Sequence, residues 1–200
     1  IATLLVLPAW LFYRAGALVL GRQRAFSGWS QAMSLIPGLS GEYLRRAFYR
    51  LCLPECGAGV VISFGTVFSH PTARLGRNVY LGVYCSIGDA TIEADVLVAS
   101  HVSIVNGGRQ HAFDRLDVPI REQTGDYPRV SIGRGAWIGE RSVIMADVGQ
   151  HSVVGAGSVV VKSVEAGVIA AGVPCRLIRR RGDAEPHARD PEEVGVTTSG

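Results

Sequence analysis

An aliphatic residue returns at every sixth position in two stretches of this sequence, and a glycine usually follows it. The first stretch contains Leu75-Gly76, Leu81-Gly82 and Ile87-Gly88, and the second runs from Ile132-Gly133 to Val160. This period fits neither the 3.6-residue repeat of a helix nor the two-residue alternation of a strand. It is typical of a chain wound into a β-helix, in which each hexapeptide forms one short strand and one turn.

The aliphatic side chains are expected to point into the coil, and the glycine after each of them is expected to allow a tight corner. The fifth position of each unit is small or β-branched, as a narrow interior requires. These residues are Val79, Cys85, Thr91, Ala136, Ser142, Ser152 and Ser158. The spacing shortens from Ile87 to Ile92 and from Ile144 to Val148, which a stack tolerates because each coil bonds only to its neighbours.

One long interruption of the repeat runs from Val105 to Arg129. This segment is polar, contains Gly107-Gly108, and is followed by a resumed repeat at Val130. Long excursions inside compact repeats are usually functional, and insertions in solenoids tend to lie on the binding face. The loop 105–129 is therefore expected to take part in binding or catalysis.

Composition sets modest limits on function. The net charge of +3 is too small to indicate nucleic-acid binding by itself, and a hydrophobic content of 48% excludes a disordered chain. The four cysteines lie far apart except for Cys52 and Cys56. Because a second metal-binding pair is missing, reduced cysteines in a cytosolic protein are favoured over a zinc site or a disulfide framework.

The first 59 residues follow a different pattern. Residues 1–20 are largely apolar, and the basic run Gly21-Arg22-Gln23-Arg24 follows them. Arg14 disfavours a helix that spans a membrane, whereas the aromatic and basic residues favour a helix at the membrane interface. These residues are Trp10, Phe12, Tyr13, Trp29, Arg14, Arg22 and Arg24. A helix packed on the coil or on a neighbouring subunit is the alternative, and the sequence leaves both open.

Residues 41–53 are expected to form an amphipathic helix that closes the open end of the β-helix. Its apolar face contains Leu44, Phe48 and Leu51, and arginines surround the other face, namely Arg45, Arg46 and Arg50. The predicted organisation is an apolar helical segment (1–59), a β-helix (60–181) and a flexible tail (182–200), which is rich in charge, proline and glycine.

Three sequence runs carry a resemblance to a known family. They are VSIGRGAWIG (130–139), VGAGSVVVK (154–162) and AGVPCRLIR (171–179). In these runs the chain resembles the hexapeptide-repeat acyltransferases, in particular the maltose and galactoside O-acetyltransferases and relatives that acetylate bacterial exopolysaccharide or lipopolysaccharide sugars. The resemblance covers about residues 60–181. It implies an all-β fold, the left-handed parallel β-helix, and a homotrimer with acyl-CoA sites between subunits.

The resemblance also implies a catalytic histidine on the long loop. Transfer of an acetyl group from a thioester to a sugar hydroxyl needs a base for the hydroxyl proton, and imidazole suits this role near neutral pH. His111 stands where the family carries its catalytic histidine, and it is predicted to be the base. His101 is a weaker alternative. Asp114, Glu122 or a backbone carbonyl remain open as the partner that fixes the imidazole tautomer.

Further residues are predicted to bind the two substrates. Asn106 and Gln110, which precede His111, are expected to orient the sugar or to donate to the developing oxyanion. Ala156 and Gly157 are small enough to admit the pantetheine arm of coenzyme A. The resemblance assigns Lys162, Arg176 and Arg179 to its phosphates. Trp137 is expected to wall the acyl channel or to pack between subunits.

The sequence thus predicts an acetyl-CoA-dependent O-acetyltransferase that modifies a sugar or lipid-linked glycan in cell-surface polysaccharide synthesis, with no metal and no nucleic-acid partner. It is expected in the cytoplasm, at the inner face of the plasma membrane, with residues 1–30 as the membrane contact. A serine acetyltransferase-like enzyme, another small-molecule acyltransferase and a non-enzymatic trimeric scaffold remain alternatives. A γ-type carbonic anhydrase is disfavoured, because His101 and His111 do not match the spacing of its zinc ligands.

Overall fold

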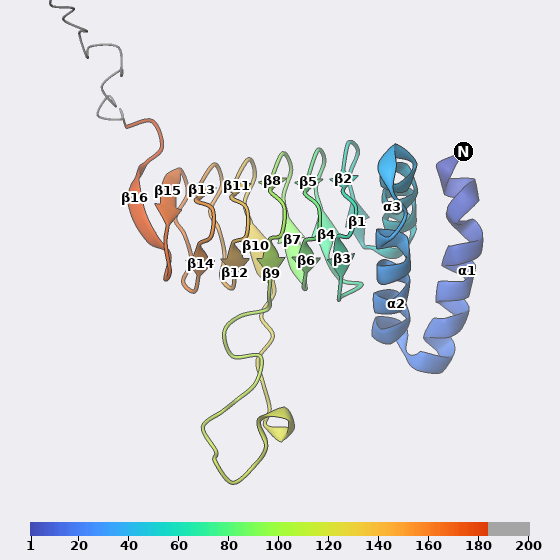
Figure 1. Cartoon of the computed structure of the whole chain (residues 1–200), viewed down its shortest axis with the longest axis horizontal. Helices are drawn as coiled ribbons and strands as arrows, with labels where there is room; N and C mark the ends of the chain where they lie inside the picture. Colours follow the sequence, from blue (N-terminus) through green and yellow to red (C-terminus); the bar gives the residue numbers. More distant parts are fainter. Residues whose placement is uncertain (184–200) are drawn as a thin grey trace, which may run out of the picture.

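The computed structural model describes residues 1–183 and consists of three α-helices followed by a β-helix, whose long loop carries the short 3₁₀ helix η1 (Ile120–Glu122) (Figure 1). Helices α1 (Ala2–Leu20), α2 (Arg22–Ser34) and α3 (Gly38–Cys52) lie at one end of the β-helix, and the loop 105–129 leaves it sideways. Most of the tail predicted for residues 182–200 lies outside the described residues.

The strands form three parallel sheets, one on each side of the coil. The first sheet contains β1 (Glu55–Cys56), β4 (Arg74–Leu75), β7 (Ala90–Ile92) and β10 (Val130–Ile132), and bridges at Val148 and Val164 extend it. The second contains β2 (Val61–Ile62), β5 (Tyr80–Leu81), β8 (Leu97–Val98), β11 (Trp137–Ile138), β13 (Val153–Val154) and β15 (Val168–Ala171), followed by the antiparallel β16 (Arg176–Arg180). The third contains β3 (Val67–Phe68), β6 (Ser86–Ile87), β9 (Ser103–Ile104), β12 (Val143–Ile144) and β14 (Val159–Val160).

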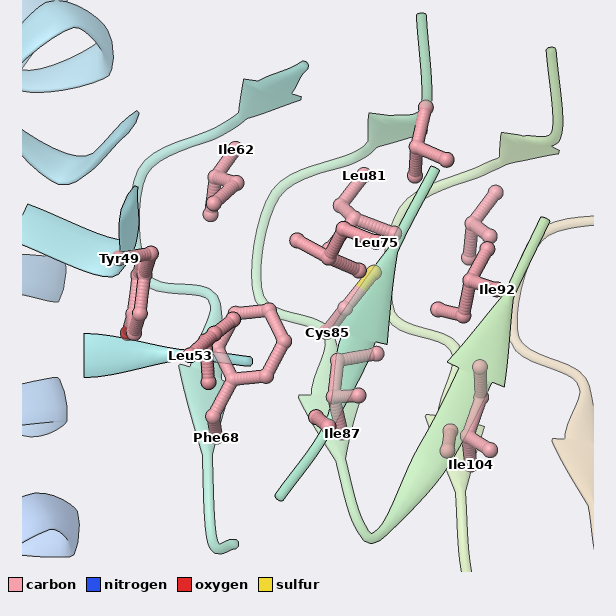
Figure 2. Close-up of a cluster of buried hydrophobic side chains, with 14 of the residues drawn as sticks. Tyr49, Leu53, Ile62, Phe68, Leu75, Leu81, Cys85, Ile87, Ile92 and Ile104 are labelled. Atoms are coloured by element: carbon pink, nitrogen blue, oxygen red, sulfur yellow. The ribbon is translucent and has the colours of Figure 1, made fainter. Parts of the chain in front are cut away.

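The predicted hexapeptide positions line the core of this β-helix. Figure 2 shows Leu75, Leu81 and Ile87 stacked beside Ile92 and Ile104 of the next coil, and all five are buried. Burial of such columns of aliphatic side chains is the main favourable term in the stability of a stack whose strands are two or three residues long. The left-handed parallel β-helix predicted from the resemblance is confirmed. Its first strand begins at Glu55, before the expected boundary at residue 60.

Several of the glycines that follow an inward aliphatic residue are required because the backbone of the neighbouring coil lies close to them. A Cβ on Gly76 would lie 2.5 Å from the backbone nitrogen of Ala94. The tight corner itself, which we expected at these glycines, falls two residues further on. There the backbone has a positive φ, both at residues that are not glycine, such as Asn78 (56°) and Tyr84 (55°), and at glycines such as Gly135 (63°).

One expected inward position is wrong. The step from Ile87 to Ile92 is one residue shorter than the others, so Ala90 takes the inward place and is buried. Thr91, which the sequence pattern assigned to the core, is only half-buried. The shortened turn shifts the alternation of inward and outward side chains by one residue.

The predicted capping helix is present as α3, and it closes the first coil. Tyr49 packs on Phe68 of β3 with ring centroids 4.6 Å apart, and its hydroxyl lies 2.7 Å from the Ser30 hydroxyl of α2. Our placement of Arg45 on the outer face is wrong, because this side chain is fully buried. Its guanidinium donates to the carbonyl oxygens of Ile62 (2.7 Å), Ile36 (2.6 Å) and Met33 (3.3 Å). Burial lowers the pKa of Arg45 from its ordinary value.

Helix α1 packs on α2 and α3 through one face only. Val6 and Tyr13 are buried in this face, and the Trp10 indole donates to the carbonyl oxygen of Leu51 (3.2 Å). Tyr13 also meets Phe26 and Phe48 edge-on. The expectation of a membrane interface is therefore wrong for Tyr13, and this face of α1 follows the alternative of a packed helix, with neighbouring helices as its partners.

The opposite face of α1 is exposed and apolar. By length and composition, α1 is also the one helix of the described residues that qualifies as a candidate membrane span. We refer to this exposed side as the outer face of α1; it is formed by Leu4, Pro8, Leu11, Ala15 and Leu18.

Candidate active site

A hydrogen-bonded clamp holds the two ends of the loop 105–129 together. Asn106 is buried at the start of the loop, where its amide oxygen accepts from the Asp89 backbone nitrogen (2.9 Å). Its amide nitrogen donates to the carbonyl oxygens of Asp89 (2.8 Å) and Pro128 (3.0 Å). At the other end of the loop, Arg129 pairs with the Asp89 carboxylate (3.0 Å), to which the Thr72 hydroxyl also donates (2.8 Å).

This clamp changes the role of Asn106. Both hydrogens of its side-chain amide are donated to backbone carbonyls, so the group is not offered to a sugar as we expected. Asn106 positions the loop instead. Sequence reasoning missed Asp89 and Arg129 altogether. The sequence feature that could have indicated Asp89 is the five-residue step from Ile87 to Ile92, because Asp89 lies in this shortened turn.

The two arms of the loop cross next to His111. The Asp126 nitrogen donates to the Arg109 carbonyl (2.8 Å), and the Ala112 nitrogen donates to the Thr124 carbonyl (3.0 Å). These bonds hold Gln110 and His111 at the crossing. The His111 ring is exposed and lies edge-on to Tyr127, with centroids 6.3 Å apart.

A hollow of about 280 Å³ lies beside this imidazole. Both arms contribute to its lining, with Arg109, Phe113, Asp114 and Asp126 among its residues. No hydrogen bond joins either His111 ring nitrogen to another group within residues 1–183, so neither Asp114, Glu122 nor a backbone carbonyl of this part of the chain fixes its tautomer. An exposed imidazole near carboxylates and one guanidinium is able to accept a proton from a bound hydroxyl.

Two of the three predicted phosphate-binding cations line a second hollow at the C-terminal end of the β-helix. Lys162 and Arg176 lie on its wall together with Glu165 and Cys175, and its volume is about 390 Å³. Burial raises the pKa of the Cys175 thiol above its ordinary value. Two cations and one carboxylate give the hollow a positive balance suited to phosphate groups.

The remaining predicted residues border neither hollow. Arg179 lies on β16, where it donates to the carbonyl oxygen of Asp183 (2.8 Å). Ala156 and Gly157 occupy an exposed turn after β13, and Gly157 has a positive φ of 67°. His101, the weaker candidate for the base, stands at a corner with φ 58° and stacks on Tyr84 at 5.5 Å.

Trp137 points outward from β11 and is 49% exposed. It belongs to a row of outward apolar side chains that runs along the parallel strands of the second sheet, from β2 to β15. Strand register places these side chains opposite one another, in the order Val61, Tyr80, Leu97, Trp137, Val153 and Ile169. The outward row of the first sheet is polar in contrast, with Glu55, Arg74, Thr91 and Ser131. The second sheet therefore presents a surface suited to another protein surface.

One chain thus places His111 in one hollow and brings Lys162 and Arg176 together in another, while Gln110 lies at the crossing without lining either hollow. His111 lies on the loop that projects sideways after β9, whereas Lys162 and Arg176 lie at the far end of the stack near β16 (Figure 1). Among the described residues, no group of three or more His, Cys, Asp or Glu side chains is arranged to hold a metal ion.

Comparison with known proteins bears on this arrangement. No family model matches the sequence. The galactoside O-acetyltransferase of Escherichia coli (strain K12) is 38% identical over 120 residues, which cover 57% of this chain and 57% of that protein. A solved structure of galactoside acetyltransferase in complex with coenzyme A aligns with a TM-score of 0.72 and 28% identity, over 86% of this chain and 88% of that chain. The resemblance to the hexapeptide-repeat acyltransferases is confirmed.

Two further relatives are named for different acceptor substrates. The putative lipopolysaccharide biosynthesis O-acetyl transferase WbbJ of Escherichia coli (strain K12) is 30% identical over 58% of this chain and 61% of that protein. The serine acetyltransferase of Salmonella typhimurium (strain LT2) is 35% identical over 64% of this chain, but the match covers only 43% of that enzyme. The chain spans less than two thirds of the length of each of these curated relatives.

Proposed function

We propose that the protein is an acetyl-CoA-dependent O-acetyltransferase that acts on a sugar hydroxyl. The observation that carries this proposal is the position of His111. The His111 imidazole is exposed and lies where the two arms of the loop 105–129 cross. The chain that carries it resembles a galactoside acetyltransferase along most of its length.

His111 would act as the general base. Its neutral ring nitrogen accepts the hydroxyl proton while the sugar oxygen attacks the thioester carbonyl. The tetrahedral intermediate then collapses, the carbon–sulfur bond breaks, and the imidazolium returns the proton to the departing thiolate of coenzyme A. General base catalysis of this kind contributes about 10²–10⁴-fold to a rate. Gln110, beside the imidazole, is assigned to orient the acceptor sugar.

The acyl donor would bind between copies of the chain. The base and the cations lie in separate hollows of one chain, and the second sheet carries an exposed apolar row that includes Tyr80, Leu97 and Trp137. A homotrimer formed through this row is proposed to bring the loop of one copy to the flank of the next. Lys162, Arg176 and Arg179 would then hold the phosphates of coenzyme A, and Ala156 and Gly157 would admit the pantetheine arm.

A glycan of the cell surface is the proposed acceptor. The similarity to WbbJ, a putative lipopolysaccharide biosynthesis enzyme, and to galactoside O-acetyltransferase favours a sugar over an amino acid. We assign the enzyme to the cytoplasmic side of the membrane, where acetyl-CoA is made.

Release of free thiol from acetyl-CoA tests the proposal directly, with galactosides, lipid-linked glycans and serine as acceptors. We expect acetylation of at least one sugar. His111→Ala should lower turnover by about 10²–10⁴-fold, with coenzyme A binding retained in calorimetry. His101→Asn is the matched control, since asparagine tolerates the left-handed backbone at this corner, and it should keep the rate.

Three results would contradict the proposal. A chain that does not bind coenzyme A would favour a non-enzymatic scaffold. Acetylation of serine without any sugar would favour the serine acetyltransferases. Full turnover in His111→Ala would remove the assigned base.

A further inference from the structure

Helix α1 turns its most apolar side away from the rest of the molecule. Leu4, Leu11 and Leu18 of its outer face recur at seven-residue spacing and are 69%, 58% and 90% exposed. Figure 1 shows α1 as the outermost layer, with α2 and α3 between it and the β-helix. No described residue covers the outer face, so a stripe of leucine is left at the end of the molecule. A surface of this kind marks an interaction site.

The charges near the outer face are all positive. Arg14, Arg22 and Arg24 are the only charged side chains among the first 41 residues, and the first acidic residue is Glu42. Arg14 and Arg22 line a hollow of about 410 Å³ together with Leu18. Arg22 and Arg24 line a second hollow of about 510 Å³ together with Leu20. Guanidinium groups suit phosphate oxygens because their planar donors form paired hydrogen bonds.

We propose that the outer face of α1 docks on an anionic lipid bilayer, with the helix lying flat in the headgroup region. The leucine stripe would enter the acyl boundary, and Arg14 of α1 with Arg22 and Arg24 at the start of α2 would meet lipid phosphates. An anionic bilayer offers acyl chains to the leucine stripe and phosphates to the three arginines. A second copy of the chain would instead bring the same three arginines together without any carboxylate to neutralise them.

The packing of α1 favours a flat orientation over a spanning one. The Trp10 indole is bonded to Leu51 of α3, and Tyr13 is held between the rings of Phe26 and Phe48. Because these contacts tie the middle of α1 to its neighbours, a spanning α1 would draw α2 and α3 into the bilayer with it. Those helices carry Arg22, Arg24, Arg46 and Arg50, which are costly in hydrocarbon. This inference does not depend on the proposed transfer reaction.

Flotation of the full-length chain with vesicles tests the proposal, using phosphatidylcholine with and without phosphatidylglycerol. We expect binding to the anionic vesicles that weakens with salt. The double variant Leu11→Gln plus Leu18→Gln should bind roughly tenfold more weakly. It should fold normally, since both side chains are exposed. Arg22→Gln plus Arg24→Gln should lose the preference for phosphatidylglycerol but keep residual binding to neutral vesicles.

Leu116→Gln plus Ile120→Gln is the matched control, because these apolar residues are equally exposed but lie on the loop. It should bind like the parent chain. The proposal is overturned if the α1 double variant binds vesicles as tightly as the parent. It is also overturned if that variant changes only the mass of the particle in light scattering, which would identify a second copy as the occupant. Resistance of the bound protein to alkaline carbonate extraction would indicate a spanning helix and would equally overturn it.

Discussion

The carbonyl oxygen of Gln110 occupies the space that a side chain on residue 125 would need. A Cβ built on Gly125 would overlap this oxygen and press against the backbone nitrogen of His111. The loop arms therefore cross only because residue 125 is glycine. This contact sets the position of the proposed base from the opposite arm.

Gly125→Ala should separate the arms and displace His111. Because misplacement of a catalytic group by about 1 Å costs up to 10²-fold, we expect turnover to fall at least tenfold. The melting temperature should hardly change, since the crossing lies outside the β-helix core. Thiol release and thermal unfolding check both expectations. Gly28→Ala is the control, because its Cβ would meet nothing within 4 Å. Equal turnover in the two variants would contradict the assigned role of the crossing.

Asn106→Ala should open the base of the loop. The change leaves the Asp89 nitrogen and the carbonyls of Asp89 and Pro128 without their partner. Loss of buried hydrogen bonds of this kind costs about 2–4 kcal/mol of unfolding free energy. Urea unfolding measures the loss, and limited proteolysis should cut the loop 105–129 faster. Gln150→Ala, at an exposed turn, should stay within about 0.5 kcal/mol of the parent. An Asn106→Ala chain as stable as this control would show that the clamp is not needed.

Arg45→Met should weaken the junction between the helices and the first coil. Methionine fills a similar length but offers no donor to the carbonyls of Ile62, Ile36 and Met33. Removal of a buried charge offsets part of this loss, since burial already disfavours the charged guanidinium. We expect the hydrogen bonds to dominate, with a net loss of about 2–3 kcal/mol in urea unfolding. Arg46→Met, on the more exposed side of α3, should change stability far less. A gain in stability for Arg45→Met would mean that desolvation outweighs the three bonds.

Stability should fall as the solution becomes alkaline. Burial raises the pKa of the Cys52 thiol from 9.0 to about 12, and that of Cys56 from 9.0 to about 11. Above pH 9 the unfolded chain loses these protons while the folded chain keeps them. The free energy of unfolding therefore decreases between pH 9 and the folded pKa values, by up to about 1.4 kcal/mol per pH unit for each thiol. Melting temperatures at pH 7 and at alkaline pH measure the slope, which Cys52→Ala plus Cys56→Ala should reduce. An unchanged slope in this variant would contradict the assignment.

The β-helix was predictable because its period is a local property. Each aliphatic residue such as Leu81 or Ile138 needs a buried place, and only one winding gives every sixth residue that place. Predictions failed where a contact depends on distant residues. The buried position of Arg45 depends on carbonyls of α2 and β2, which no helical pattern reveals.

The candidate site was only partly predictable for the same reason. His111 stood out because it lies in the one long polar interruption, and the sequence located that interruption correctly. The pairing of Asp89 with Arg129 joins residues 40 positions apart, and it depends on how the loop returns to the first sheet. The loop has no repeat and no core of its own, so its internal crossing at Gly125 could be seen only in three dimensions.

The axis of α1 runs across the end of the β-helix, crosswise to the direction in which the coils stack (Figure 1). If α1 lay flat on a bilayer, the axis of the β-helix would therefore point away from the membrane plane. The loop departs after β9, the third strand of its sheet from the helical end. With strands about 4.8 Å apart and two helix layers of about 10 Å each, His111 would sit roughly 30 Å above the membrane plane. A glycan anchored in that membrane would have to carry its reactive hydroxyl on an extended saccharide chain. The length of the saccharide would therefore limit which acceptors can meet His111.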